Sequence, residues 1–298
     1  MKKSVIAAVA AASGAVIFAS AAIANYTTAN GYEVVKDSLF GLFGTENYTY
    51  DFEMSMDEGE DYVLSFGTHT EMDEPNKRCY MNDTNSTKLP GEDHSYQFKR
   101  WYNDNMTIYQ HDDGQPEGYT TEARDSSMTN YTNMFSDELF GDADTTAKVL
   151  HFMEVALDTA VGDLKNNFIY TGTEDGVKTY NLSLDAIQIP ELLNAGLSAF
   201  ASVTADNNEG FENVSEEEQW VADIVTMDNV YTDSISGVFA VNEDNSFNSG
   251  EVSAVITGKD RNGETHNLTF RVKMGMSDAG STVPQPAPEN VNIRSIQY

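Results

Sequence analysis

The chain has 298 residues, and its content of 40% hydrophobic and 11% aromatic residues excludes a protein that is disordered as a whole. Its 17 Lys and Arg residues oppose 48 Asp and Glu residues, a formal net charge of −31 that excludes nucleic acid as a partner, because phosphate binding requires a surplus of basic side chains. The single cysteine, Cys79, excludes an internal disulfide, so stability has to come from a hydrophobic core.

The first 24 residues predict an export signal or a membrane anchor. Lys2 and Lys3 precede the uncharged, Ala-rich run Ser4–Ala24, which is close to the ~20 apolar residues that a spanning helix needs. The residues Ala22-Ile23-Ala24 also fit a signal-peptidase site, so cleavage and secretion remain the alternative to retention. We expect retention, with the N-terminus in the cytoplasm and the body outside.

The residues that follow predict a helix and then an antiparallel meander. Apolar residues near helical spacing favour a helix within Gly31–Gly44. From Tyr48 to Met56 every second residue is large and apolar, as in a half-buried strand, and Tyr62–Phe66 repeats the pattern. We expect a polar loop at Asn82–Asp93, and further strands at Arg78–Met81, Ser95–Tyr102, Met106–Gln110 and Tyr119–Ala123.

The middle of the chain predicts helices. Apolar residues from Leu150 to Leu164 recur at helical spacing, and Asp144 or Thr145 is the expected N-cap. His151 lies beside this apolar stripe, which predicts a partly buried structural role. A hairpin is expected at 168–184, around Asp175-Gly176. Two further helices are expected, one starting at Pro190 and one after Ser215.

The last third returns to strands, at Val230–Val241, Glu251–Gly258 and Thr265–Met276. The overall order indicates an α+β protein with a large curved antiparallel sheet, a half-barrel, wrapped around two or three helices and preceded by the N-terminal membrane segment. We divide the chain into that segment (1–24), a single extracytoplasmic half-barrel-like domain (25–276) and a Pro-rich extended C-terminal tail (277–298) that we do not expect to pack.

Four features carry a resemblance to a known family: the Gly31–Phe43 helix leading into Tyr48–Met56, the hairpin from Tyr170-Thr-Gly172 to Tyr180-Asn-Leu182, the Ile189-Pro190-Glu-Leu192 helix start, and the final run from Asp260–His266 through Phe270 to Ser277–Gly280 and Pro284. This pattern resembles the lipoprotein-carrier superfamily of half-barrel proteins (LolA, LppX/LprG and RseB types), especially its membrane-anchored members in Gram-positive bacteria. The resemblance implies a hydrophobic cavity between sheet and helices that holds acyl chains or senses envelope components. Some relatives bind a membrane-bound regulator of a transcription factor. The anchor and the strong acidity depart from a shuttling carrier.

The sequence lacks the residue patterns that are typical of common catalytic and metal sites. The five histidines form no His-Glu-x-x-His pair, and neither a Gly-x-Ser-x-Gly elbow nor an EF-hand loop occurs. The clusters at Asp142/Asp144 and Asn242–Asn245 could supply Ca²⁺ ligands, but turn chemistry accounts for them equally well. We expect Cys79 to be a buried, inert thiol. The sequence therefore predicts no catalytic residue, metal or cofactor, and a protein that is not an enzyme.

The leading hypothesis is a non-catalytic extracytoplasmic binding or sensor protein of the bacterial cell envelope. It would hold an acyl chain, a lipid or another apolar ligand and regulate a membrane-bound partner. The residues expected to line the cavity are Tyr50, Phe52, Leu64, Phe66, Leu150, Met153, Leu157 and Phe270. The same residues could instead fill a solid core, which is the arrangement that we favour. The alternatives are a ligand-free interaction module acting on a membrane-bound, anti-sigma-type regulator, and a secreted hydrolase.

Overall fold

A computed structural model describes residues 31–59, 62–89, 92–103, 106–110, 119–123, 142–161, 167–189, 227–260, 262–289 and 293–295. Its helices are α2 (Gly31–Phe40) and α3 (Ala143–Val161). Its strands are β1 (Asn47–Glu58), β2 (Tyr62–Asp73), β3 (Arg78–Leu89), β4 (Glu92–Asn103), β5 (Met106–Gln110), β6 (Tyr119–Ala123), β7 (Phe168–Glu174), β8 (Val177–Asp185), β9 (Asp228–Asn242), β10 (Phe247–Lys259), β11 (Thr265–Ser277) and β12 (Ile293–Ser295). The N-terminal segment and the helices expected at Pro190 and after Ser215 lie outside these residues.

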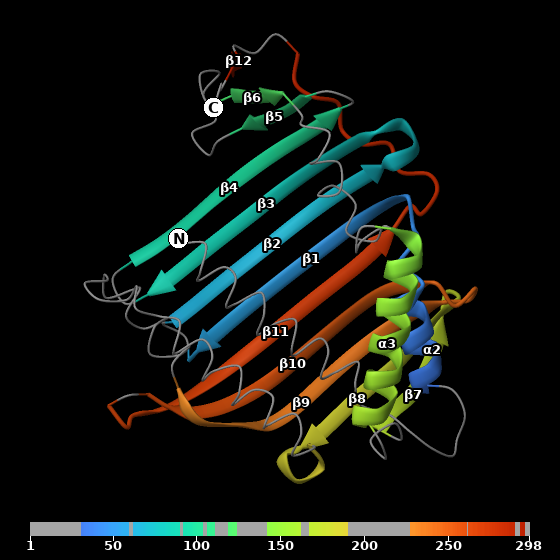
Figure 1. The fold of residues 1–298 in the computed structure, drawn as a ribbon. Coiled ribbons are helices and arrows are strands. Elements are labelled where there is room, and N and C mark those ends of the chain that lie inside the picture. Colours follow the sequence, from blue (N-terminus) through green and yellow to red (C-terminus); the bar gives the residue numbers. More distant parts are fainter. Residues whose placement is uncertain are drawn as a thin grey trace.

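The strands form one large curved sheet (Figure 1). Its twelve strands follow the order β12-β6-β5-β4-β3-β2-β1-β11-β10-β9-β8-β7. Strand β1 pairs with β2 on one side and with β11 on the other, so the first and last thirds of the described chain meet at the centre of the sheet. Among the described strands every pairing is antiparallel except that of β12 with β6, which is parallel. The expected large antiparallel sheet is confirmed.

The polar loop expected at Asn82–Asp93 is wrong. Residues 82–89 belong to β3, which pairs in register with β2 and with β4, and β4 already begins at Glu92. The segment is rich in Asn, Thr and Ser and lacks the apolar alternation that marks a half-buried strand. Its neighbours on both sides satisfy its backbone groups, and this pairing outweighs its weak local pattern.

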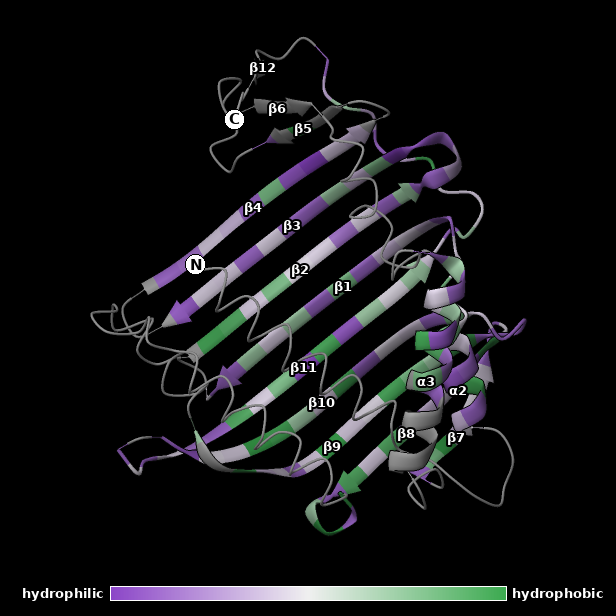
Figure 2. Ribbon diagram, viewed as in Figure 1, coloured by the Kyte–Doolittle hydropathy of each residue, from purple (hydrophilic) through white to green (hydrophobic). Residues whose placement is uncertain are grey.

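Strict alternation gives the sheet two unlike faces. On β1, Tyr48, Tyr50, Met54 and Met56 are buried on one face, here called the apolar face, whereas Asp51 and Glu53 are exposed on the other, the polar face. Hydrophobic residues gather on β8–β11, and β4 is mainly hydrophilic or neutral (Figure 2).

The two described helices lie side by side over one end of the sheet (Figure 1). Helix α2 contacts β7, β9 and β10, and buries Tyr32 and Val35 in the main core. Lys36 is also buried in α2, where its Nζ lies 2.8 Å from Glu33 and 3.2 Å from Glu154 of α3. The described helices therefore cover β7–β10.

Two details of α3 correct the sequence reading. The N-cap is Asp142, whose Oδ1 accepts a hydrogen bond from the Thr145 amide at 2.8 Å. The Thr145 backbone and side-chain hydrogen bonds lower the pKa of the Asp142 carboxyl. The side chain of His151 is 75% exposed, with Nδ1 3.7 Å from Glu154, and so is not partly buried as expected.

Within the described residues, no helix combines the length and apolarity needed to cross a membrane.

The Pro-rich tail packs onto the sheet, contrary to expectation. Thr282 is 5% exposed, and its backbone N–H and C=O both bond to the side-chain amide of Asn47. Further along, the Gln285 amide donates to Glu71 at 2.6 Å, and Ala287 packs against a buried aromatic cluster on the polar face. An extended segment without internal hydrogen bonds offers its backbone groups to neighbours, and here the sheet supplies the partners.

Candidate functional site

The sheet residues expected to line a cavity do share the apolar face. Cross-strand pairing places Leu64 and Phe270 beside Met56, and both belong to the main buried core. Tyr50 lies in a second buried cluster, and burial raises the pKa of its phenol far above the ordinary range. Phe52 and Phe66 are half-buried.

The helical lining residues are only partly described. Leu150 is half-buried on α3, and the side chains of Met153 and Leu157 lie outside the described part of the structure. The cavity itself therefore stays a prediction.

Half-buried apolar side chains continue the apolar face beyond the part that α2 covers. The ring of Phe52 stacks on Tyr50 with centroids 6.3 Å apart and lies 6.3 Å from Phe66. Methionines and one tyrosine of the neighbouring strands are also only partly buried: Met81, Tyr102, Met274 and Met276. Aromatic rings and flexible methionines together form an adaptable surface for apolar groups.

A group of polar side chains interrupts this apolar surface, and we call Thr68, Asp83 and Arg100 the polar island. Thr68 pairs directly with Asp83 across β2 and β3. Arg100 of β4 forms an ion pair with Asp83 through Nη2, and its Nη1 donates to the Tyr102 hydroxyl at 3.4 Å. Thr68 is 7% and Asp83 9% exposed, so the island is buried within the apolar face.

Three atoms of the polar island lack a hydrogen-bond partner within the described structure: Thr68 Oγ1, Asp83 Oδ1 and Arg100 Nε. Buried polar atoms are bonded to protein or to water in the great majority of cases, so these three neighbouring atoms need partners from water or from a bound molecule. Sequence reasoning missed the island because Asp83 fell in an expected loop. The sequence did offer one sign of it: Thr68 is a polar residue at a position that, like Leu64 and Phe66, alternation places on the apolar face.

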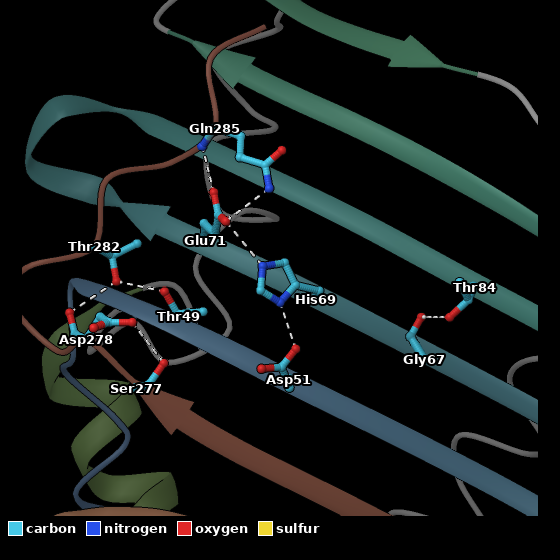
Figure 3. Close-up of polar contacts among 10 residues, drawn as sticks. All are labelled: Thr49, Asp51, Gly67, His69, Glu71, Thr84, Ser277, Asp278, Thr282 and Gln285. Atoms are coloured by element: carbon cyan, nitrogen blue, oxygen red, sulfur yellow. Dashed lines mark hydrogen bonds and ion pairs between the residues drawn. The ribbon is translucent and has the colours of Figure 1, made fainter. Parts of the chain in front are cut away.

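A hollow of about 480 Å³ lies on the polar face, directly behind the polar island. The residues that line it come from β11, β1, β2 and β3: Asp51, Phe52, Glu53, Ser65, Phe66, Gly67, Thr68, His69, Asn82, Thr84, Lys273, Met274 and Gly275. The backbone of Gly67 forms part of its floor, and a Cβ there would lie 2.8 Å from Thr84 Oγ1. Thr84 Oγ1 donates to the Gly67 carbonyl at 3.4 Å (Figure 3).

His69 connects this hollow to the C-terminal tail. Its Nδ1 lies 2.7 Å from Asp51 Oδ1 and its Nε2 3.2 Å from Glu71 Oε1 (Figure 3). Burial alone would lower the pKa of His69, but the hydrogen bonds and charges of Asp51 and Glu71 outweigh it and raise the pKa above its ordinary value. The same Glu71 carboxylate accepts the hydrogen bonds of Gln285.

Neither face of the sheet, as far as its residues are described, shows an assembled metal centre. In the part of the chain that the structure describes, no three His, Cys, Asp or Glu side chains come together in a way that could hold a metal ion. Cys79 is buried in the cluster that contains Tyr50. What the two faces offer is binding chemistry: an apolar surface with a buried polar island, and a polar hollow.

Comparison with known proteins does not assign the chain to a family. No protein-family model and no curated protein matches the chain. Among solved structures it is similar to the LolA superfamily protein NE2245 from Nitrosomonas europaea, with 8% identity over 88% of this chain and 96% of that one and a TM-score of 0.20.

Two other solved structures are similar at the same level. Rv2717c from M. tuberculosis has 6% identity over 84% of this chain and 99% of its own, with a TM-score of 0.19. A porin-like protein from Bacteroides uniformis has 9% identity over 79% and 99%, with a TM-score of 0.24. TM-scores this low do not establish a shared fold, so the function of this chain has to be argued from its own residues.

Proposed function

We propose that this protein is a non-catalytic extracytoplasmic binding protein that holds an apolar ligand, such as an acyl chain, against the apolar face of its sheet. The observation that carries the proposal is the continuation of that face, beyond α2, into half-buried aromatic and methionine side chains. The Phe52 ring is central among them, in contact with Tyr50 and Phe66. The uncharged Ser4–Ala24 segment supports a place outside the cytoplasm, at the membrane.

Native mass spectrometry of the purified full chain tests the proposal. We expect a population carrying an added lipid mass that disappears after solvent extraction, and binding of the neutral apolar dye N-phenylnaphthylamine that the extracted lipid reverses. A chain that shows the apo mass alone and does not bind the dye would refute the proposal.

A matched pair of variants locates the binding surface. Phe52→Ser should weaken dye binding about tenfold or more, because burying an aromatic side chain contributes ~1.5–3 kcal/mol. Val238→Ser removes an apolar residue that is 48% exposed on the opposite face and should leave binding unchanged. Circular dichroism and thermal unfolding confirm that both variants fold. Equal losses in the two variants would contradict binding at the apolar face.

A second candidate function has an observation of its own. Strand β7 is an edge of the described sheet, and two of its apolar side chains are exposed, Ile169 by 61% and Tyr170 by 54%. Exposed apolar residues on an edge strand favour pairing with another chain. A ligand-free chain that forms a stoichiometric complex with a membrane-bound regulator, lost in Ile169→Lys, would support this interaction module over ligand binding.

A further inference from the structure

We infer that the polar island binds the uncharged, hydroxyl-bearing end of an amphiphile whose chain lies along the apolar face. The inference rests on the proposed function and names the class of ligand. It follows from the position of Thr68, Asp83 and Arg100, from their spare hydrogen-bonding atoms, and from the balance of their charges.

The position of the polar island suits the end of an apolar chain. The register places Phe52, Thr68, Asp83 and Phe98 side by side on four consecutive strands, β1 to β4. The two polar residues therefore have an aromatic residue on each side. The Arg100 guanidinium lies 5.7 Å from the centre of the Phe98 ring, which holds it beside this row.

The spare atoms of the polar island define what a ligand must supply. Arg100 Nε needs an acceptor, Asp83 Oδ1 needs a donor, and Thr68 Oγ1 can take either. The remaining contacts of the pair are already made, between Arg100 Nη2 and Asp83 Oδ2 and between Arg100 Nη1 and Tyr102. A hydroxyl group donates one hydrogen bond and accepts others, so its hydrogen-bonding capacity matches the needs of all three atoms.

Charge excludes the common ionic alternatives. Asp83 and Arg100 form a pair with no net charge. A carboxylate or phosphate only accepts hydrogen bonds, so it leaves Asp83 Oδ1 unpaired and adds a second negative charge beside it. An ammonium group only donates, so it leaves Arg100 Nε unpaired. A neutral hydroxyl end both donates and accepts and adds no charge, so it matches the site where these ionic groups do not.

Calorimetry on the full chain with soluble octanoyl and octyl probes tests the inference. We expect 1-monooctanoylglycerol to bind at least tenfold more tightly than octanoate or octylamine, which share its chain length. Octyl glucoside, compared with monooctanoylglycerol, distinguishes a sugar hydroxyl from a glycerol hydroxyl. If all probes bind equally well, the proposed function stands and this inference fails. If none binds, the proposed function fails and the inference fails with it.

Two variants on one strand connect the preference to the polar island. Thr68→Val keeps the side-chain shape and should weaken monooctanoylglycerol binding about fivefold, the loss expected for one net hydrogen bond, while octanoate binding and thermal stability are retained. Thr70→Val is the matched control, since Thr70 lies on the same strand and face and is 5% exposed. Equal losses in both variants would overturn the inference.

A third variant inverts the preference. Asp83→Asn removes the negative charge and leaves Arg100 without its counter-charge, so octanoate should now bind more tightly than monooctanoylglycerol. Retention of the original order in a folded Asp83→Asn variant, with thermal unfolding as the folding check, would contradict the charge argument.

Discussion

Asn47→Ala should release the C-terminal tail from the sheet. The Asn47 side chain makes two hydrogen bonds to the backbone of Thr282: its Nδ2 donates to the carbonyl at 3.0 Å and its Oδ1 accepts from the amide at 2.7 Å. The substitution removes both and keeps the bond from the Gly280 amide to the Asn47 backbone carbonyl. At about 0.5–1.5 kcal/mol net for each hydrogen bond, the free energy of unfolding should fall by about 1–3 kcal/mol.

Urea denaturation measures this loss, and limited trypsin digestion shows where it acts. Arg294 lies in β12, which pairs with β6, so wild-type protein should resist cleavage there. We expect faster cleavage after Arg294 in Asn47→Ala, identified by the mass of the product. Asn76→Ala is the control, because the Asn76 side chain donates an exposed hydrogen bond to the Asp73 carboxylate at 2.8 Å, away from the tail. Identical stability and digestion in the two variants would refute the conclusion that the Asn47 side chain holds the C-terminal tail on the sheet.

Two further predictions concern the α2 contact and the polar face. A Cβ on Gly31 would lie 2.5 Å from the Phe168 carbonyl oxygen, so Gly31→Ala should lower the free energy of unfolding by about 1–3 kcal/mol in urea denaturation. A change within about 0.5 kcal/mol would contradict the close packing of α2 on β7. His69 has a raised folded pKa, so its contribution to stability is complete below its unfolded pKa of about 6.5 and is lost as the pH rises through the folded value. Unfolding measured from about pH 5.5 to 8.5 should show this loss in the wild type and not in His69→Gln, and parallel curves would refute it.

Strands with strong alternation could be predicted from the sequence. The expected Tyr48–Met56 and Thr265–Met276 strands correspond to β1 and β11, because each places an unbroken row of apolar side chains on one face. The second half of β3 could not, since residues 82–88 are polar on both faces and only pairing with β2 and β4 makes them a strand. The packing of the tail also could not be predicted from local sequence, because its partners lie more than two hundred positions away in the sequence.

The candidate site was half predictable for the same reason. Phe52 and Phe66 follow from alternation within single strands, which local sequence shows directly. The polar island depends on the register between strands: Thr68, Asp83 and Arg100 meet only because β2, β3 and β4 pair as they do. A one-residue slip of β3 would move Asp83 to the polar face and bring Asn82 or Thr84 in its place. Local patterns carry no information about that choice.

The register that builds the polar island also builds the hollow behind it. Pairing of Thr68 with Asp83 fixes the pairing of Gly67 with Thr84 and of His69 with Asn82, whose side chains point to the opposite face. A substitution that shifts these strands therefore changes both sites together, and a loss of binding would not identify the face responsible. Thr68→Val and Thr70→Val avoid this, because they keep the β-branched shape and leave the backbone pairing intact. A difference between those two variants assigns ligand recognition to the Thr68 hydroxyl of the polar island.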